Sequence, residues 1–115
     1  MDKVKIISPT NRFWFVGRHK GSADWVKLQG IHIDYYVEHI DVDNGPQPGD
    51  TVIGTLPVHL IAQLNAMGVR FVHLQLSLSN EDRGKELCAR RLLSLRPKLV
   101  EYLALKIQQV KSENV

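Results

Sequence analysis

The stretch that decides the fold of this chain is TVIGTLPVHL, residues 51–60. Its first three residues are β-branched and predict a buried strand that ends at Gly54 and Thr55. A helix is then expected to begin at Pro57, because proline is common in the first turn of a helix. The first backbone N–H groups of a helix have no partner within it and favour an anion. This stretch therefore predicts an anion site at the point where a strand passes into a helix.

A second stretch of the same kind is GRHKG, residues 17–21, which follows an expected aromatic strand at residues 13–16. A helix is expected to come next and to stop at Gly30. Arg18 can contact a phosphate through two N–H groups, and His19 can exchange a proton near neutral pH. An ordinary solvated loop explains the same residues about equally well, so the stretch predicts a pocket only together with the first one.

The pattern along the chain predicts one domain over residues 1–115, with residues 1–10 as an edge strand or a loosely attached extension. The other expected elements are strands at 31–40, 51–55 and 69–78, helices at 57–67 and 79–95, and an amphipathic C-terminal helix at 98–112. This order favours a three-layer α/β fold with a mainly parallel sheet. Nearly all crossovers are right-handed. The strands from residues 12 and 51 are therefore expected side by side, at a switch point where such folds bind ligands.

Composition narrows the class of ligand. The net charge of +3 is too mild for a protein that wraps long nucleic acid, whose binding depends on many phosphate contacts. Acidic residues gather in 34–50 and basic residues in 83–98, which favours a compact anionic ligand or an oligomer contact. The single cysteine, Cys88, excludes an internal disulfide and fits a cytoplasmic protein. No apolar run approaches the roughly 20 residues of a membrane span, and no signal peptide is expected.

Four further residues are weaker candidates for the site. His59 lies in the first turn of the helix expected at 57–67, where its ring faces either the pocket or solvent. Arg83 and Gly84 open another expected helix, and glycine there lets a ligand come close, although a tolerated surface glycine is the plainer explanation. His39 lies at the end of an expected strand. Trp25 is expected in the core rather than as a platform for base stacking.

Several other chemistries are disfavoured by the motifs that the sequence lacks. No histidine pair has zinc-motif spacing, and one cysteine cannot build a structural zinc site. Neither the phosphate-binding loop of nucleotide triphosphatases nor the glycine motif of dinucleotide dehydrogenases occurs. Asp41 and Asp43 could hold a divalent ion, but a turn rich in Asp, Asn and Gly needs no metal to explain it. We therefore expect neither a metal nor a cofactor.

At these residues the sequence resembles the Csx16 family, compact ring nucleases that are accessory proteins of type III CRISPR systems. The resemblance covers residues 12–90 and rests chiefly on QPGDTVIGTLPVHL, residues 47–60. Shorter matches in the expected order are GRHKG at 17–21, Trp25, Gly30-Ile31, His39-Ile40-Asp41, His73-Leu74 and RGKEL at 83–87. Lys20 departs from the proline expected in the family, and this could alter its loop.

The resemblance implies a Rossmann-like fold related to the CARF domains that sense cyclic oligoadenylates. It also implies cleavage of such a messenger, cyclic tetra-adenylate above all, which would switch off antiviral signalling without a metal. Cutting the ring by a ribose 2′-hydroxyl requires in-line positioning, charge stabilisation and proton transfer. The catalytic candidates are Arg18, His19, His59 and Arg83, and the expected substrate-binding residues are Gly17, His39, Gly54, Thr55, Leu56, Pro57, Val58 and Gly84.

Two other functions fit the sequence. A non-catalytic module could bind the same messenger in the same pocket. A protein-interaction subunit could instead use the basic residues at 83–98, including Arg90 and Arg91, to contact an acidic partner or RNA. A homodimer is expected because the ring ligand is itself rotationally symmetric. The apolar stripe of the helix expected at 98–112 would form the contact or, equally well, pack on its own sheet.

Overall fold

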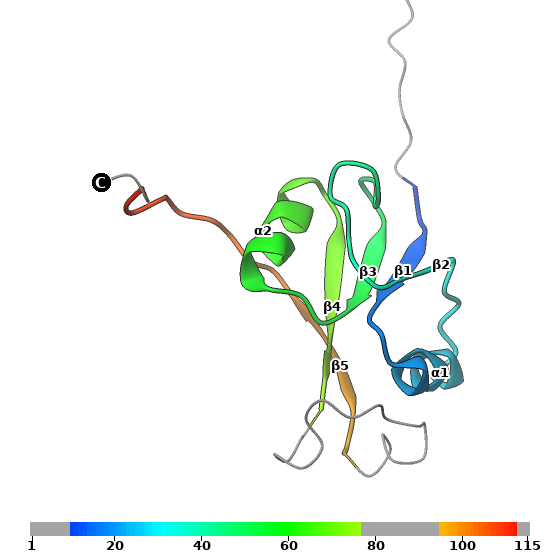
Figure 1. The fold of residues 1–115 in the computed structure, drawn as a ribbon. Helices are drawn as coiled ribbons and strands as arrows, with labels where there is room; N and C mark the ends of the chain where they lie inside the picture. Colours follow the sequence, from blue (N-terminus) through cyan, green and yellow to red (C-terminus); the bar gives the residue numbers. More distant parts are fainter. Residues whose placement is uncertain (1–9, 77–94, 113–115) are drawn as a thin grey trace, which may run out of the picture.

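Figure 1 shows a computed structural model of the chain, which we describe for residues 10–76 and 95–112. Its elements are β1 (Phe13–Val16), α1 (Lys20–Leu28), β2 (Tyr35–Val37), β3 (Thr51–Gly54), α2 (Val58–Ala66), β4 (Arg70–Gln75) and β5 (Lys98–Tyr102). The strands form one sheet in the order β2-β1-β3-β4-β5. All neighbouring pairs are parallel except β4 with β5. The predicted α/β fold with a mainly parallel sheet is therefore confirmed.

The two helices cover opposite faces of this sheet. Phe15 of β1 packs in one core cluster with Trp25 of α1. The next residue, Val16, packs in a second cluster with Leu64 of α2. Successive strand residues point to opposite faces, so these clusters lie on the two sides of one sheet. The three layers are as predicted, and Trp25 lies in the core, where it is 6% exposed.

The switch point of the sheet lies between β1 and β3. These strands are neighbours, and their last residues, Val16 and Gly54, pair in register. The chain leaves β1 for the helix on one face and leaves β3 for the helix on the other. The strand order 2-1-3-4-5 is common in doubly wound sheets, which bind ligands at this position. The prediction that these two strands lie side by side is confirmed.

Gly54 allows the ends of β1 and β3 to come close together. Its φ of +146° is rarely adopted by residues with a side chain, and an added Cβ would lie 2.2 Å from the carbonyl oxygen of Val16. A larger residue would force the strand ends apart or turn the chain in another direction. The glycine therefore sets the shape of the switch point.

A buried carboxylate ties together the opposite ends of the same two strands. Asp50 is 1% exposed and accepts hydrogen bonds from the backbone N–H groups of Arg12 and Gln47, both at 2.9 Å. Trp14 Nε1 donates at 3.0 Å, and the hydroxyl of Thr10 also donates. Burial alone would raise the pKa of this carboxyl, but the four hydrogen bonds together lower it below its ordinary value. The four hydrogen bonds thus take the place of water around the negative charge of the Asp50 carboxylate.

The prediction of a C-terminal helix over residues 98–112 was wrong. Lys98–Tyr102 form β5, which pairs with β4 from Phe71 opposite Tyr102 to Gln75 opposite Lys98. Residues 103–112 contain no helix and lead past α2, away from the sheet (Figure 1). Pairing with the open edge of β4 satisfies a row of backbone groups, and this outweighs the helical spacing of the apolar side chains.

Other predicted bounds also changed. The strand expected at 31–40 is reduced to Tyr35–Val37, because its neighbour β1 is only four residues long and no strand flanks its other side within the described part. The strand expected at 69–78 is confirmed as Arg70–Gln75. The helix expected at 79–95 and the extension expected at 1–10 lie outside the described residues, apart from Thr10 and Leu95.

Candidate functional site

A pocket of about 500 Å³ lies at the carboxyl ends of β1 and β3. Three segments build it: the loop after β1, the residues after β2 and the turn between β3 and α2. Its lining residues are Val16, Gly17, Arg18, His19, Glu38, His39, Ile40, Thr55, Leu56, Pro57 and Leu60. The position is the switch point, and the volume falls in the range of roughly 300–1,000 Å³ that ligand sites occupy. We call it the switch-point pocket.

The switch-point pocket collects most of the site residues predicted after β1, β2 and β3. Those that line it are Gly17, Arg18, His19, His39, Thr55, Leu56 and Pro57. They come from three separate segments of sequence, which meet only because β1 lies between β2 and β3. The roles assigned to them stay predictions.

Five of the predicted site residues are not among the lining residues. Gly54 is buried beneath the pocket and acts through the backbone path described above. Val58 and His59 lie in the first turn of α2, and both side chains are exposed. Arg83 and Gly84 lie outside the described residues. The pocket therefore gives no support to the imidazole of His59 as a proton donor.

Both helices begin beside this pocket. His19 is the N-cap residue of α1, Pro57 is the N-cap residue of α2, and both residues line the pocket. Neither N-terminus has a side-chain cap, and neither helix has an acidic residue in its first turn. Unpaired N–H groups and the helix dipole attract negative charge. Two helix N-termini at one pocket therefore favour an anionic ligand, phosphate in particular.

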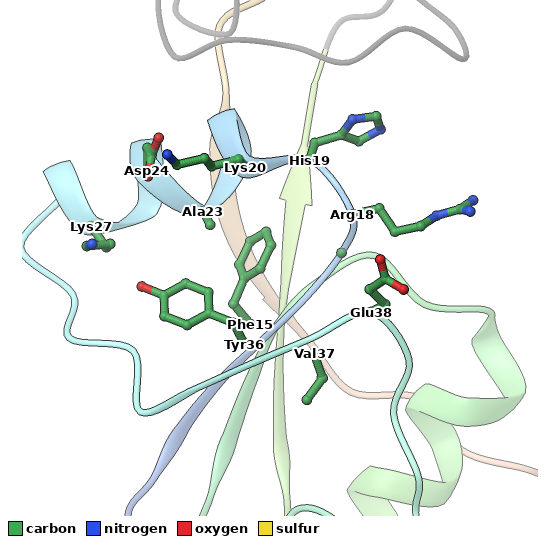
Figure 2. Close-up of a pocket in the computed structure, with 11 residues that line it drawn as sticks. Phe15, Arg18, His19, Lys20, Ala23, Asp24, Lys27, Tyr36, Val37 and Glu38 are labelled. Carbon is green, nitrogen blue, oxygen red and sulfur yellow. The ribbon is translucent and has the colours of Figure 1, made fainter.

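Three side chains add chemistry to this electrostatic setting. Arg18 is exposed and His19 is half-buried, both in the loop between β1 and α1 (Figure 2). His39 is exposed and follows β2. Within residues 10–76 and 95–112, no ion pair involves Arg18. The pocket thus combines a guanidinium, which suits a phosphate, with two imidazoles, which can donate or accept a proton near neutral pH.

A second pocket, of about 370 Å³, adjoins the first (Figure 2). The two share Gly17, Arg18, His19 and Glu38, so one wall separates them. We call it the aromatic pocket.

The aromatic pocket has an apolar floor and a charged rim. Phe15 is buried at its base, and the half-exposed ring of Tyr36 lies 6.4 Å from the Phe15 ring, centroid to centroid. Lys20, Asp24 and Lys27 of α1 line the rim. A flat group with an apolar face and polar edges, such as a nucleobase, fits this combination.

Glu38 is the pocket residue that the sequence did not reveal. It is exposed and lines both pockets. The strand expected to run to residue 40 hid the fact that β2 ends at Val37, one residue before it. Its neighbour His39, already a candidate, was the available signal. A carboxylate repels phosphate, but it accepts hydrogen bonds from hydroxyl and amino groups.

The described residues contain neither a cluster of metal ligands nor a membrane-spanning helix. No group of three or more His, Cys, Asp or Glu side chains in residues 10–76 and 95–112 is arranged to hold a metal ion. In that same part of the chain, no helix is long and apolar enough to cross a membrane.

The fold and the pockets define a class: an α/β protein with a mainly parallel sheet and two adjoining pockets at the switch point of that sheet. Comparison with known families narrows this class. Residues 14–105 match a family model described as "Putative CRISPR-associated protein (Cas_VVA1548)". The match covers most of the chain and both pockets, so the chain belongs to this CRISPR-associated family. No curated protein and no solved structure matches the chain.

Proposed function

We propose that this protein is a ring nuclease that cleaves a cyclic oligoadenylate messenger, cyclic tetra-adenylate above all, and so ends type III CRISPR antiviral signalling. The observation that carries the proposal is the switch-point pocket, where Arg18, His19 and His39 stand with two helix N-termini. Membership of a CRISPR-associated family supports the biological setting. The pocket supports the chemistry, because it offers a phosphate its counter-charge together with groups that transfer protons.

In the proposed reaction a ribose 2′-hydroxyl attacks the adjacent phosphorus. The O2′–P bond forms and the P–O5′ bond breaks, which leaves a 2′,3′-cyclic phosphate and a 5′-hydroxyl. One group removes the proton of the 2′-hydroxyl, and another gives a proton to the departing 5′ oxygen. His19 and His39 suit these two roles because they enter the same pocket from different strand ends. General acid–base catalysis of this kind contributes about 10²–10⁴-fold.

The negative charge that builds up on the phosphoryl oxygens also needs partners. In this proposal, Arg18 and the N–H groups at the start of α1 and α2 provide them, since Arg18 and both N-cap residues line the pocket. A fixed donor of this kind contributes about 10²–10³-fold to the rate. All of these groups belong to the protein, so we expect cleavage to proceed with a chelator present.

The aromatic pocket is the proposed site for an adenine next to the scissile phosphate. The base would stack on Tyr36, and Glu38 would accept a hydrogen bond from its amino group. Stacking on an aromatic ring contributes about 1–3 kcal/mol per base. Arg18 and Glu38 line both pockets. One nucleotide could therefore place its base in the aromatic pocket and its phosphate in the switch-point pocket while it contacts the wall between them.

We also propose that the fold is Rossmann-like and related to the CARF domains that sense these messengers. The strand order and the pocket at the switch point support this relation. The antiparallel β5 is the departure from a fully parallel sheet.

The test is incubation of the purified protein with cyclic tetra-adenylate in EDTA, followed by chromatography and mass spectrometry. We expect linear di-adenylate that carries a cyclic phosphate. Arg18→Ala should lower the rate by about 10²–10³-fold. Arg12→Ala is the matched control, because this exposed arginine lies at the other end of β1 and should leave the rate unchanged.

Three other results would argue against the proposal. An intact ring that elutes with the protein would indicate a non-catalytic binding module. An intact ring without binding would favour the protein-interaction function. Equal rates for the two arginine variants, each shown to be folded by circular dichroism, would remove Arg18 from the site.

A further inference from the structure

A third pocket, of about 550 Å³, continues the row that the switch-point pocket and the aromatic pocket form. Its lining residues are Lys27, Gly30, Ile31, His32, Ile33 and Tyr36. Two of them, Lys27 and Tyr36, also line the aromatic pocket, which in turn shares Arg18 and Glu38 with the switch-point pocket. Figure 2 shows Lys27 at the end of α1 that lies away from Arg18. The three pockets thus adjoin one another along α1.

The polarity of α1 distinguishes the two ends of this row. The helix begins at its N-cap residue His19, which lines the first two pockets, and its last turn, with Lys27, lines the third. The carbonyl groups of the last turn carry partial negative charge, and that of Lys27 accepts a hydrogen bond from Gly30 at 3.0 Å. Phosphate is therefore favoured at the start of α1, and a neutral group that donates hydrogen bonds, such as a base with an amino group, at its end.

The walls of the third pocket suit a flat ring. Ile33 is buried in a core cluster, and the half-buried Ile31 packs against that cluster, so this side of the pocket is apolar. The imidazole of His32 is exposed, with its Nε2 3.3 Å from Oδ1 of Asp34. The other carboxylate oxygen of Asp34 accepts a hydrogen bond from the backbone N–H of Phe13 at 2.8 Å. The imidazole is thus positioned by a residue tied to β1, and nucleobases stack on rings of this kind.

The boundary between the aromatic pocket and the third pocket has the groups that a dinucleotide needs. The ring of Tyr36 is 50% exposed and lines both pockets, so it can contact a base on either side. Lys27 is exposed at the same boundary, where its ammonium group can neutralise a phosphate that joins two nucleosides. A separate ligand in the third pocket would leave this shared cation without a role.

We propose that the third pocket binds a second adenosine of the messenger, so that one chain contacts two consecutive nucleotides. The first adenine occupies the aromatic pocket and the second lies between His32 and Tyr36, with Lys27 at the phosphate that joins them. The inference rests on the proposed function, because it concerns the same ligand. It adds the length of messenger that one chain contacts and the residues that recognise its second base.

An NMR titration of the isotope-labelled protein tests this footprint. The two ligands are 2′-deoxyadenosine 5′-monophosphate and the corresponding deoxyadenylate dinucleotide, which lack the 2′-hydroxyl that the proposed cleavage requires and therefore stay intact. Both should shift the amide signal of Gly17, which lines the first two pockets. Only the dinucleotide should also shift the signals of Gly30 and His32, which belong to the third pocket.

A pair of variants separates the second base from the first. His32→Ala should weaken binding of the dinucleotide by about fivefold or more, the loss expected when one stacking contact is removed, and should leave binding of the mononucleotide unchanged. Leu28→Ala is the matched control, because this 71% exposed residue of α1 lies outside the lining of all three pockets. It should bind both ligands as the wild type does. The amide spectrum of each variant also reports whether it is folded.

Three results would overturn the inference while the proposed function stands. One is a dinucleotide that shifts Gly17 but neither Gly30 nor His32, and another is a His32 variant that binds the dinucleotide as tightly as the wild type. The third is a mononucleotide that shifts Gly30 as strongly as the dinucleotide does, which would show a separate site. If neither ligand shifted any of these signals, the inference and the proposed function would both be overturned.

Discussion

Replacing Asp50 with alanine should remove a large part of the stability of this protein. The carboxylate is 1% exposed and accepts hydrogen bonds from Arg12, Gln47, Trp14 and Thr10. Alanine leaves all of these donors without their partner. A hydrogen bond to a charged group contributes about 1.5–3 kcal/mol, but water entering the vacated space would satisfy some donors. We therefore expect a loss of about 3–5 kcal/mol, against a total stability of about 5–15 kcal/mol.

Urea denaturation followed by circular dichroism at neutral pH measures this loss. Asp43→Ala is the matched control, because this aspartate is exposed and its carboxylate accepts no hydrogen bond from the described residues. The control should lie within about 0.5 kcal/mol of the wild type. If the Asp50 variant also stayed within about 1 kcal/mol, the reasoning that this carboxylate ties the strand ends together would be refuted.

The same carboxylate should make stability depend on acid pH. Burial opposes ionisation, but the hydrogen bonds outweigh it, so the pKa of Asp50 lies below its ordinary value of 3.8. The stability that the ionised group contributes is complete above the unfolded-state pKa, and it is lost as pH falls through the lower pKa of the folded state. Asp50→Asn should be less stable at neutral pH and should lack this part of the acid dependence. Parallel plots of stability against pH for the two proteins would contradict the assignment.

Three further predictions concern the switch point, the aromatic pocket and the core. Gly54→Ala should lower the melting temperature and weaken ligand binding, because the new Cβ would meet the carbonyl oxygen of Val16. Thermal melts and calorimetry measure these two effects, and a variant with neither effect would rule out the close approach. Tyr36→Ala should weaken binding of cyclic tetra-adenylate by about 10-fold or more. Tyr35→Ala should not, because the Tyr35 ring packs on Trp14, and equal effects in a binding titration would argue against stacking on Tyr36. Trp25→Ala should cost about 3–5 kcal/mol in urea denaturation, and a negligible loss would mean that the indole is not a core residue.

The parts of the fold that the sequence predicts well are those with strong local signals. The β-branched run at 51–53 and the aromatic run at 13–16 have no helical alternative, and each is followed by glycine. Their adjacency follows from the handedness of crossovers rather than from either segment alone. For this reason the switch point, and with it the presence of Arg18 and Thr55 at one pocket, could be predicted from the sequence.

The prediction for the chain after residue 98 failed because its apolar residues fit both the helical and the strand period. Leu99, Leu103 and Ile107 have helical spacing, whereas Leu103, Leu105 and Ile107 alternate as in a strand. The choice depends on whether β4 has a free edge, which is a property of the whole sheet. Local patterns could not contain that information.

Two polar residues of importance were missed for a related reason. Asp50 looked like an ordinary residue of a turn, and its four donors become visible only when Thr10, Arg12 and Trp14 are folded against it. Glu38 lay inside a strand that was expected to be longer. In both cases the significance of the residue comes from neighbours distant in sequence.

The polar residues of the switch-point pocket contribute little to holding the fold together. Arg18, Glu38 and His39 are exposed, and none belongs to either core cluster. Stability rests on those clusters and on Asp50 at the far ends of β1 and β3. Substitutions at the mouth of the pocket should therefore leave solubility and yield almost unchanged. If the proposed function holds, ligand preference can change at this edge during evolution without a cost in folding, and libraries randomised there can be screened directly for altered ring size.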